Sequence, residues 1–390
     1  MLDFTDPAFR ADPYAAFAAQ RAAAPLAWHE GLQAYVATSH AAACAVLRER
    51  RLGRIFAPRQ PDSDWETFNW LHADSILDSE PPKHTRLRRL VAGAFGRGHV
   101  QRLAPRIEAL ATGLLDDALA SGPEFDVIAA YAEPLPVLVI AELLGFPDVD
   151  RHLLRPWSQA IVKMYEVDRT PAQEEEARAA CREFAAYVSG LAARRAGSPG
   201  EDLLTDLVQI RDGSDRLSER ELIATAVLLL NAGHEASVNG FGNGLHSWLA
   251  AGKPAIDPGD PVAVERIVEE FLRHDCPLQL FERTATADVD LLGVPIAKGQ
   301  KAIALLGAAN RDPAVFPEPD HFDPARDPNE HIAFGLGIHF CIGAPLARLE
   351  MQIATRLLLA RAPALALVTA ERRPTFVLRG FERLIVSARP

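Results

Sequence analysis

One cysteine near the C-terminus stands in a setting that suits a reactive thiolate. Cys341 lies in the decamer FGLGIHFCIG, residues 334–343, and the pattern predicts an amphipathic helix directly after it. The unpaired N–H groups and the dipole of a helix N-terminus stabilise negative charge on such a sulfur. Glycines, which lack a Cβ, let backbone amides approach it closely. The decamer therefore favours a metal-ligating thiolate, with a buried structural cysteine as the alternative.

The decamer resembles the haem-binding signature of cytochromes P450, Phe-x-x-Gly-x-His-x-Cys-x-Gly, with every fixed position matched. In that family the cysteine is the axial ligand of the haem iron, and its thiolate favours O–O cleavage. The resemblance implies haem b as cofactor and Cys341 as the metal ligand. It also implies a cofactor-binding loop that includes Phe334, Gly335, His339, Cys341 and Gly343.

Two anionic haem propionates call for cationic or hydrogen-bonding partners. His84 and Arg88 are spaced i, i+4, so a helix would present them on one face. The pair resembles the His-x-x-x-Arg of P450s, and Arg283 and His339 match two further propionate contacts. For residues 83–89 alone, a solvated basic face is the alternative.

Glu270 and Arg273 form a Glu-x-x-Arg pair, which any helix can contain. In P450s this pair joins an arginine from the loop before the cysteine in a buried network, and Arg326 matches that third member. We expect the three residues to serve folding and haem retention rather than chemistry.

A long helix carries the segment LLLNAGHEAS, residues 228–237. Ala232 and Gly233 lie in a stripe that also holds Leu229, Ala236 and Ser237, and their small size would leave room for O₂ above a flat cofactor. Close helix packing is the alternative explanation for small residues at these positions.

The same segment resembles the P450 motif Ala-Gly-x-Glu/Asp-Thr-Thr/Ser, with one departure. Ala236 stands where P450s have a threonine whose hydroxyl helps deliver protons, whereas the acid, Glu235, is retained. An Ala-Ser pair resembles certain macrolide-hydroxylating P450s in which a substrate hydroxyl and water help to replace the missing group. The catalytic candidates are therefore Glu235, Ala236 and Ser237, with Ser237, water or the substrate completing the proton relay.

Bulk composition excludes several other classes of protein. Acidic residues exceed Lys and Arg by 11 in 390 residues, which disfavours nucleic acid as a partner. The four cysteines contain no Cys-x-x-Cys pair, which argues against zinc ribbons and covalent c-type haem. No signal-peptide pattern begins the sequence and no apolar run is long enough to span a bilayer, so we expect a soluble, cytoplasmic monomer.

The elements that position these residues are mostly helices. We expect helices at residues 12–24, 39–47, 102–119, 174–195 and 217–250, the last opened by a Ser218/Glu221 capping box. Strands are expected at residues 34–38, 281–285, 289–292, 302–305 and near both ends of 374–387. Residues 310–329 should form an irregular loop. The fold class is mainly α (α+β), a helix-rich single domain over residues 1–390 with small β-sheets.

Electrons must come from another protein, because the chain contains no flavin or iron–sulfur module. A ferredoxin or flavodoxin with its reductase could be steered by the basic cluster Arg86, Arg89, Arg97, Arg102 and Arg106, unless these are ordinary solvated arginines.

Family position nominates substrate-pocket segments at the loop 65–76 and at 162–167, 278–281 and Phe381. Trp65, Phe68 and Trp70 are alternatively local core.

Together, these residues predict a P450 monooxygenase that hydroxylates an apolar to moderately oxygenated small molecule of natural-product metabolism. Two rivals share the motifs: a P450 that performs coupling, desaturation or peroxide-driven oxidation, and a haem-thiolate protein that binds a ligand without turnover.

The Gly-x-Gly-x-Gly at residues 240–244 is not a nucleotide loop, because no strand precedes it and its spacing is wrong.

Overall fold

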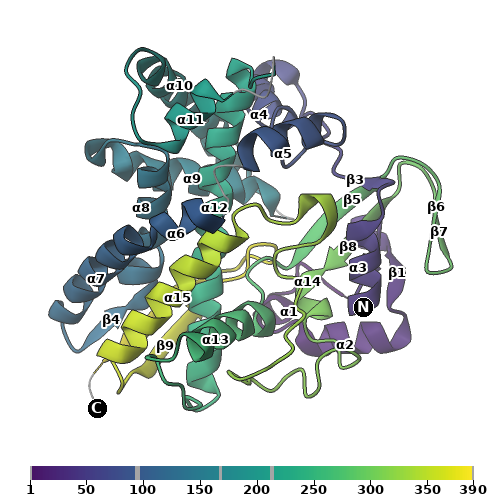
Figure 1. Cartoon of the computed structure of the whole chain (residues 1–390). Coiled ribbons are helices and arrows are strands. Elements are labelled where there is room, and N and C mark those ends of the chain that lie inside the picture. Colours follow the sequence, from purple (N-terminus) through teal and green to yellow (C-terminus); the bar gives the residue numbers. More distant parts are fainter. Residues whose placement is uncertain (1, 93–96, 167–168, 211–214, 389–390) are drawn as a thin grey trace. The chain divides into compact units, whose positions relative to one another are not determined.

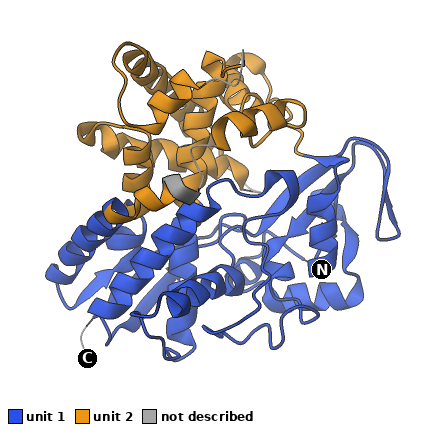
Figure 2. Ribbon diagram, viewed as in Figure 1, with its two compact units in different colours: residues 1–53, 106–134, 236–390 blue, residues 54–105, 135–235 orange. Residues whose placement is uncertain are grey.

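The computed structural model describes residues 2–92, 97–166, 169–210 and 215–388, without the side chains of 97–99. The chain divides into two compact units (Figure 2). Unit 1 comprises residues 1–53, 106–134 and 236–390, and unit 2 comprises residues 54–105 and 135–235. The expectation of a single domain stays a prediction.

Unit 1 contains a five-stranded sheet in the order β1-β2-β8-β5-β3. Its strands are β1 (Leu26–His29), β2 (Ala34–Ala37), β8 (Lys301–Leu305), β5 (Leu280–Ala285) and β3 (Leu52–Gly53). Only the β2–β8 pairing is parallel. The hairpin of β6 (Val289–Leu291) and β7 (Val294–Ile296) projects from this sheet (Figure 1). Buried residues from β2 and β8 join the phenylalanines of the N-terminal segment in one hydrophobic cluster.

A second sheet of unit 1 has the order β4-β10-β9, formed by β4 (Glu124–Asp126), β10 (Phe381–Ser387) and β9 (Ala366–Arg372). The helices that lie largely in unit 1 are α1 (Pro7–Ala11), α2 (Tyr14–Ala23), α3 (His40–Arg48), α7 (Ala104–Ala120), α13 (Pro261–His274), α14 (Leu306–Ala309) and α15 (Ala344–Arg361). Helices α13 and α15 pack against each other.

Unit 2 is built from helices. They are α4 (Asp62–Ala73), α5 (Lys83–Ala92), α6 (Arg97–Arg102), α8 (Pro134–Leu143), α9 (Leu154–Val162), α10 (Pro171–Gly197) and α11 (Leu203–Gln209). Helix α10 packs on α4, α9 and α11. Its start is fixed by a capping box in which Thr170 and Gln173 bond each other's backbone N–H.

Helix α12 (Glu219–Ala250) runs from unit 2 into unit 1. At 1.5 Å per residue its length is about 48 Å. The predicted capping box is present: the Ser218 N–H donates to Glu221 Oε2 at 2.9 Å, and the Glu221 N–H donates to Ser218 Oγ at 3.3 Å.

The glycines at 240, 242 and 244 lie inside α12, which confirms that they form no nucleotide loop. They allow close packing instead. A Cβ on Gly244 would come within 2.0 Å of Phe271 Cγ, and one on Gly242 within 2.7 Å of Ile128 Cδ1.

Most predicted elements are confirmed, and residues 310–329 contain neither a helix nor a strand. Two expectations are wrong. Residues 65–73 belong to helix α4 rather than to a loop, because Trp65, Phe68 and His72, spaced three and four residues apart, are buried on one face of it. The first end of 374–387 is no strand, since only Leu378 makes an isolated bridge, and the strand that was missed, β9, lies just before it.

Candidate active site

The cysteine loop is held by backbone geometry that only glycine tolerates well. Gly335 and Gly337 have φ values of +69° and +73°. A Cβ on Gly337 would lie 2.6 Å from the carbonyl oxygen of Leu47. Gly343 differs, because its φ is −83° and a Cβ there would make an ordinary 3.9 Å contact with Cys341 Sγ. The steric argument for glycine therefore applies to positions 335 and 337 and not to 343.

Cys341 is the exposed cysteine, whereas Cys44, Cys181 and Cys276 are buried. Its N–H donates to the carbonyl oxygen of Phe334 at 3.0 Å, which closes the loop. Helix α15 begins three residues later, at Ala344, so the cysteine stands at the N-terminus of an 18-residue helix as predicted. An accessible sulfur at this place fits the axial ligand of haem.

Phe334 anchors the loop to a charged network that sequence reasoning missed. The Arg348 guanidinium lies 4.5 Å from the centre of its ring and donates to both carboxylate oxygens of Glu269 at 2.7 Å. Glu269 also contacts His331 Nε2 at 2.9 Å. Burial raises the pKa of Glu269, but the hydrogen bonds from Arg348 and His331 outweigh it and lower the pKa to about 2. The sequence shows only that Arg348 lies one turn into the helix that follows Cys341. This position does not reveal that Glu269 is its partner.

The Glu-x-x-Arg network is present as expected. Arg273 donates to both carboxylate oxygens of Glu270 at 2.7 Å, and both side chains are fully buried. Arg326 adds an ion pair to Glu270 at 3.2 Å. The Asp323 N–H and the Asn329 amide also donate to this carboxylate. The carboxylate is thereby surrounded by donors from α13 and from the loop that precedes the cysteine.

Arg283 projects from β5 and is 3% exposed. Its guanidinium donates to the carbonyl oxygen of Glu282 at 2.9 Å and lies 5.6 Å from the centre of the Phe281 ring. The Phe281 ring also faces the cysteine loop, because its Cε2 is 3.0 Å from the place that a Cβ on Gly335 would take. His339 lies in the short 3₁₀ helix Gly337–His339 and is half-buried.

Small residues interrupt the burial of α12. Ala232 is exposed and Gly233, Ala236 and Ser237 are partly exposed, although their neighbours Leu230, Asn231, His234 and Glu235 are buried. The small residues thus lie on one accessible stripe. Gly233 also has a packing role, since a Cβ there would lie 3.0 Å from Ile140 Cδ1. Glu235 Oε1 is 3.9 Å from His234 Nδ1, and both side chains are buried.

His84 and Arg88 lie one turn apart on α5, as predicted, with His84 buried and Arg88 half-buried. They belong to unit 2, together with Ala232, Gly233 and Glu235. The cysteine loop, Arg283, Ala236 and Ser237 belong to unit 1. The residues expected to hold the cofactor are therefore divided between the two units.

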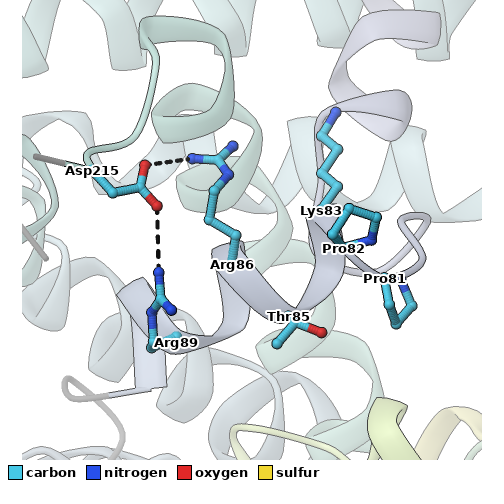
Figure 3. A pocket seen from close by; sticks show the side chains of 7 residues that line it. All are labelled: Pro81, Pro82, Lys83, Thr85, Arg86, Arg89 and Asp215. Carbon is cyan, nitrogen blue, oxygen red and sulfur yellow. Dashed lines mark hydrogen bonds and ion pairs between the residues drawn. The ribbon is translucent and has the colours of Figure 1, made fainter.

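The basic cluster is more neutralised than its sequence suggests. Arg86 forms an ion pair with Glu221. Arg86 and Arg89 also pair with Asp215, at 3.2 Å and 3.5 Å (Figure 3). These side chains line an open hollow of about 870 Å³. Lys83, on its rim, pairs with Asp74 at 2.6 Å. The side chain of Arg97 lies outside the described residues.

Trp65 and Phe68 of α4 form local core, the alternative left open by the sequence, whereas Trp70 is half-buried with Arg220 over its ring. Trp65 and Phe68 are 4% and 3% exposed, and their rings contact edge to face with 5.3 Å between centres. The Arg59 guanidinium covers both rings. Phe381 is likewise buried, beneath Arg372. Of the segment 162–167, residue 167 lies outside the described residues.

The family model described as Cytochrome P450 matches residues 263–362. The chain is 38% identical over 387 residues to the cytochrome P450 monooxygenase PikC of Streptomyces venezuelae, which covers 96% of this chain and 91% of that protein. The chain belongs to the cytochrome P450 family. This P450 is also 37% identical to 6-deoxyerythronolide B hydroxylase of Saccharopolyspora erythraea, over 98% of each protein.

Solved P450 structures share the fold. P450BioI, solved in complex with acyl carrier protein ligated to hexadec-9Z-enoic acid, has a TM-score of 0.93 and 33% sequence identity. The match covers 98% of this chain and 99% of that one. The cofactor of this P450 is haem b, bound through a cysteine thiolate, and the enzyme is an oxidoreductase of the monooxygenase type. Bacterial P450s take electrons from redox partners such as ferredoxin. Within the described residues, no helix has the length and apolarity needed to cross a membrane.

Proposed function

We propose that this P450 hydroxylates a largely apolar small molecule of secondary metabolism that bears an oxygen function near the carbon to be oxidised. The observation that carries the proposal is Ala236. It lies on the accessible stripe of α12, at the place where the family motif has a threonine, and it offers no hydroxyl. A hydroxyl or carbonyl of the substrate then supplies the missing hydrogen-bonding group.

The remaining groups of the proton relay are proposed to be Glu235 and Ser237. Glu235 is 4% exposed and follows His234, so its carboxyl is held in a dry part of the helix. Ser237 is partly exposed and has the hydroxyl that Ala236 lacks. Haem b supplies dioxygen activation when it is bound. Glu235 would supply the proton, and Ser237, an ordered water or the substrate would pass it on.

We assign cofactor binding to residues of both units. Cys341 would ligate the iron, and its loop positions Phe334, Gly335, His339 and Gly343 would shape the thiolate side. His84, Arg88, Arg283 and His339 would pair with the propionates, whose two charges need such donors. Ala232 and Gly233 would leave room for dioxygen. The electron donor is proposed to be a ferredoxin or flavodoxin, to which Arg89 offers a side chain that is 59% exposed.

Coupling between electrons and product tests the proposal. With a surrogate ferredoxin and reductase, we expect oxygen-bearing substrates to give a high ratio of product to NAD(P)H consumed, and deoxygenated analogues to leak peroxide. Ala236→Thr should raise the ratio for the analogues most. Uniformly tight coupling in substrates that lack oxygen would defeat the substrate-assisted relay. A product mass increased by one oxygen separates hydroxylation from coupling and desaturation.

The haem assignment has its own test. Dithionite-reduced protein treated with carbon monoxide should show the absorption typical of thiolate ligation, and Cys341→Ser should lose both that spectrum and turnover. Cys44→Ser, a change at a buried cysteine, is the matched control. An absorption maximum typical of histidine ligation in the parent protein would overturn the assignment of Cys341.

A further inference from the structure

Unit 2 contains a small cavity that the haem-binding residues do not line. Its walls come from α4 and the segment after it, from the end of α9 with the short 3₁₀ helix Lys163–Tyr165, and from α12. The volume open to a water-sized sphere is about 10 Å³. This space accepts one water-sized polar group, such as a hydroxyl, and no ring.

Most polar groups at the cavity have partners in the protein. His72 is 7% exposed, and its Nδ1–H donates to the carbonyl oxygen of Phe68 at 2.8 Å. Its Nε2 is therefore the acceptor for the Tyr165 hydroxyl at 3.4 Å. Asp78 forms an ion pair with Arg54 at 2.9 Å. These groups need no ligand.

Asn231 is the exception. This residue lines the cavity from α12 and is 6% exposed, and its Oδ1 is buried with no hydrogen-bond partner among the described residues. An unpaired buried amide oxygen costs free energy, so such a residue is retained where something other than stability selects it. The rest of this wall, Ala224, Val227 and Leu228, is apolar.

Asn69 provides a contrast within unit 2. It is 7% exposed and also lies on a helix, α4. Its Oδ1 accepts from the Arg59 N–H at 2.9 Å, and its Nδ2 donates to the Arg59 carbonyl at 3.1 Å and to Asp62 at 2.9 Å. Two equally buried asparagines thus differ in whether the protein itself satisfies them.

We propose that Asn231 is a specificity-determining residue that binds a hydroxyl group of the substrate. The group fits the volume, and a hydroxyl both donates and accepts, so it can pair with either end of the amide. The inference rests on the proposed monooxygenase function and narrows its substrate class to apolar molecules with a hydroxyl. Asn231 lies five residues before Ala236, about 7.5 Å along the helix axis. The bound hydroxyl orients the molecule along α12.

Stability of the haem-loaded, ligand-free protein gives the first test. Asn231→Leu should raise the thermal midpoint by about 1–3 °C, because it removes an unpaired buried polar atom. Asn69→Leu should lower the midpoint by about 4–8 °C, because three hydrogen bonds are lost. Both replacements change asparagine to leucine within a helix, so the gain in helix propensity is the same in the two variants and cancels when their midpoints are compared. A comparable fall for Asn231→Leu would show that the amide only holds structural water, and would overturn the proposal.

Ligand binding gives the second test. The probes are testosterone and its 17-deoxy analogue, and 12-hydroxydodecanoic acid and dodecanoic acid, titrated by the haem absorbance change. In any pair that binds, Asn231→Leu should weaken the hydroxylated member about tenfold and leave the other unchanged. An unaltered hydroxyl preference overturns the proposal; if no pair binds, the stability result decides. Neither measurement requires turnover, so failure of the monooxygenase assays and failure at Asn231 are separate results.

Discussion

The Glu270 network of unit 1 and the polar residues around the cavity of unit 2 are both buried. They differ in how completely their hydrogen-bonding groups are paired. Glu270 receives hydrogen bonds from Arg273, from Arg326 and from two further donors. Among the residues that line the cavity of unit 2, Asn231 instead has an amide oxygen without a partner in the described part of the chain, and His72 and Tyr165 make a long 3.4 Å contact. Saturated networks fix a geometry, whereas unsatisfied groups leave capacity for a ligand. We therefore assign the paired network around Glu270 to cofactor retention and the unpaired Asn231 to substrate selectivity.

A third cluster of unit 1 follows the same rule. Asp275 is 2% exposed and is bound by Arg379, Arg372 and the Tyr14 hydroxyl, each at 2.7 Å. Burial raises the pKa of Asp275, but the two arginines and the hydroxyl outweigh it, so the pKa lies far below its ordinary value. This cluster ties the N-terminal helices to the segment between β9 and β10. Glu270 and Asp275 of unit 1 thus both have several charged or hydrogen-bonding partners.

The largest effect that tests the contrast is expected from Glu270→Ala. It leaves Arg273 and Arg326 buried beside each other without their carboxylate, at a cost of about 3–5 kcal/mol in the free energy of unfolding. We expect haem-free or insoluble protein, measured as haem absorbance per mole of purified chain. Glu265→Ala, on the exposed face of the same helix, should change stability by less than about 0.5 kcal/mol. A soluble Glu270→Ala protein with normal haem content would refute the retention role.

Two glycines of the cysteine loop test whether rigidity there comes from the backbone as well. Gly337→Ala must adopt a φ of +73° and meets the Leu47 carbonyl at 2.6 Å, so we expect a loss of about 3 kcal/mol. Gly343→Ala has φ −83° and would make only an ordinary 3.9 Å contact with Cys341 Sγ, so its expected loss is below about 0.5 kcal/mol. Chemical denaturation of both variants measures the difference. Equal losses would mean that the loop is not held by its left-handed glycines.

The helix after Cys341 and the Glu270–Arg273 pair were predictable because local spacing encodes them. The haem role of the cysteine loop and the third network member, Arg326, 56 residues from Glu270, followed only from the resemblance to P450s. Capping residues likewise located the start of α12. The Glu269–Arg348–His331 cluster was not predictable, since its members are separated by 62 and 79 residues and meet only through packing. Helix α4 was missed because its aromatic residues bury against Arg59 and Arg178, a tertiary effect. The sequence could not show that Asn231 Oδ1 lacks a hydrogen-bond partner among the described residues, because this depends on which side chains pack around it in the fold.

The pH dependence of stability sharpens the contrast, with a smaller effect. The pKa of Glu269 is about 2, against an ordinary value of 4.5, so its ion pair stabilises the fold above pH 4.5. This stabilisation is lost as pH falls from about 5 to 2, when the folded state must also take up the proton. Because Arg348 is partly exposed, we expect Glu269→Gln to cost about 2 kcal/mol at pH 7, and less than half of that at pH 3.

Unfolding in denaturant at pH 7, 5, 4 and 3 measures this difference between the parent protein and Glu269→Gln. Glu265→Gln removes the same charge from the exposed face of α13 and controls for the change in net charge. A cost of Glu269→Gln that is the same at pH 7 and pH 3 would show that the ionised carboxylate is not what Arg348 and His331 recognise.

The smallest expected effect comes from the cavity side. The Tyr165 hydroxyl donates to His72 Nε2 at 3.4 Å, near the limit of a hydrogen bond, so Tyr165→Phe should cost about 0.5 kcal/mol. Tyr187→Phe, also in unit 2, removes a hydroxyl that donates to the Asp150 carboxylate at 2.6 Å and should cost about 1.5–3 kcal/mol. The two variants are compared by urea unfolding of the haem-loaded protein without substrate. If Tyr165→Phe proves as costly as Tyr187→Phe, the Tyr165 hydroxyl at the cavity contributes to the fold as strongly as a short, charge-assisted hydrogen bond elsewhere in unit 2, and the contrast between satisfied networks and the cavity fails.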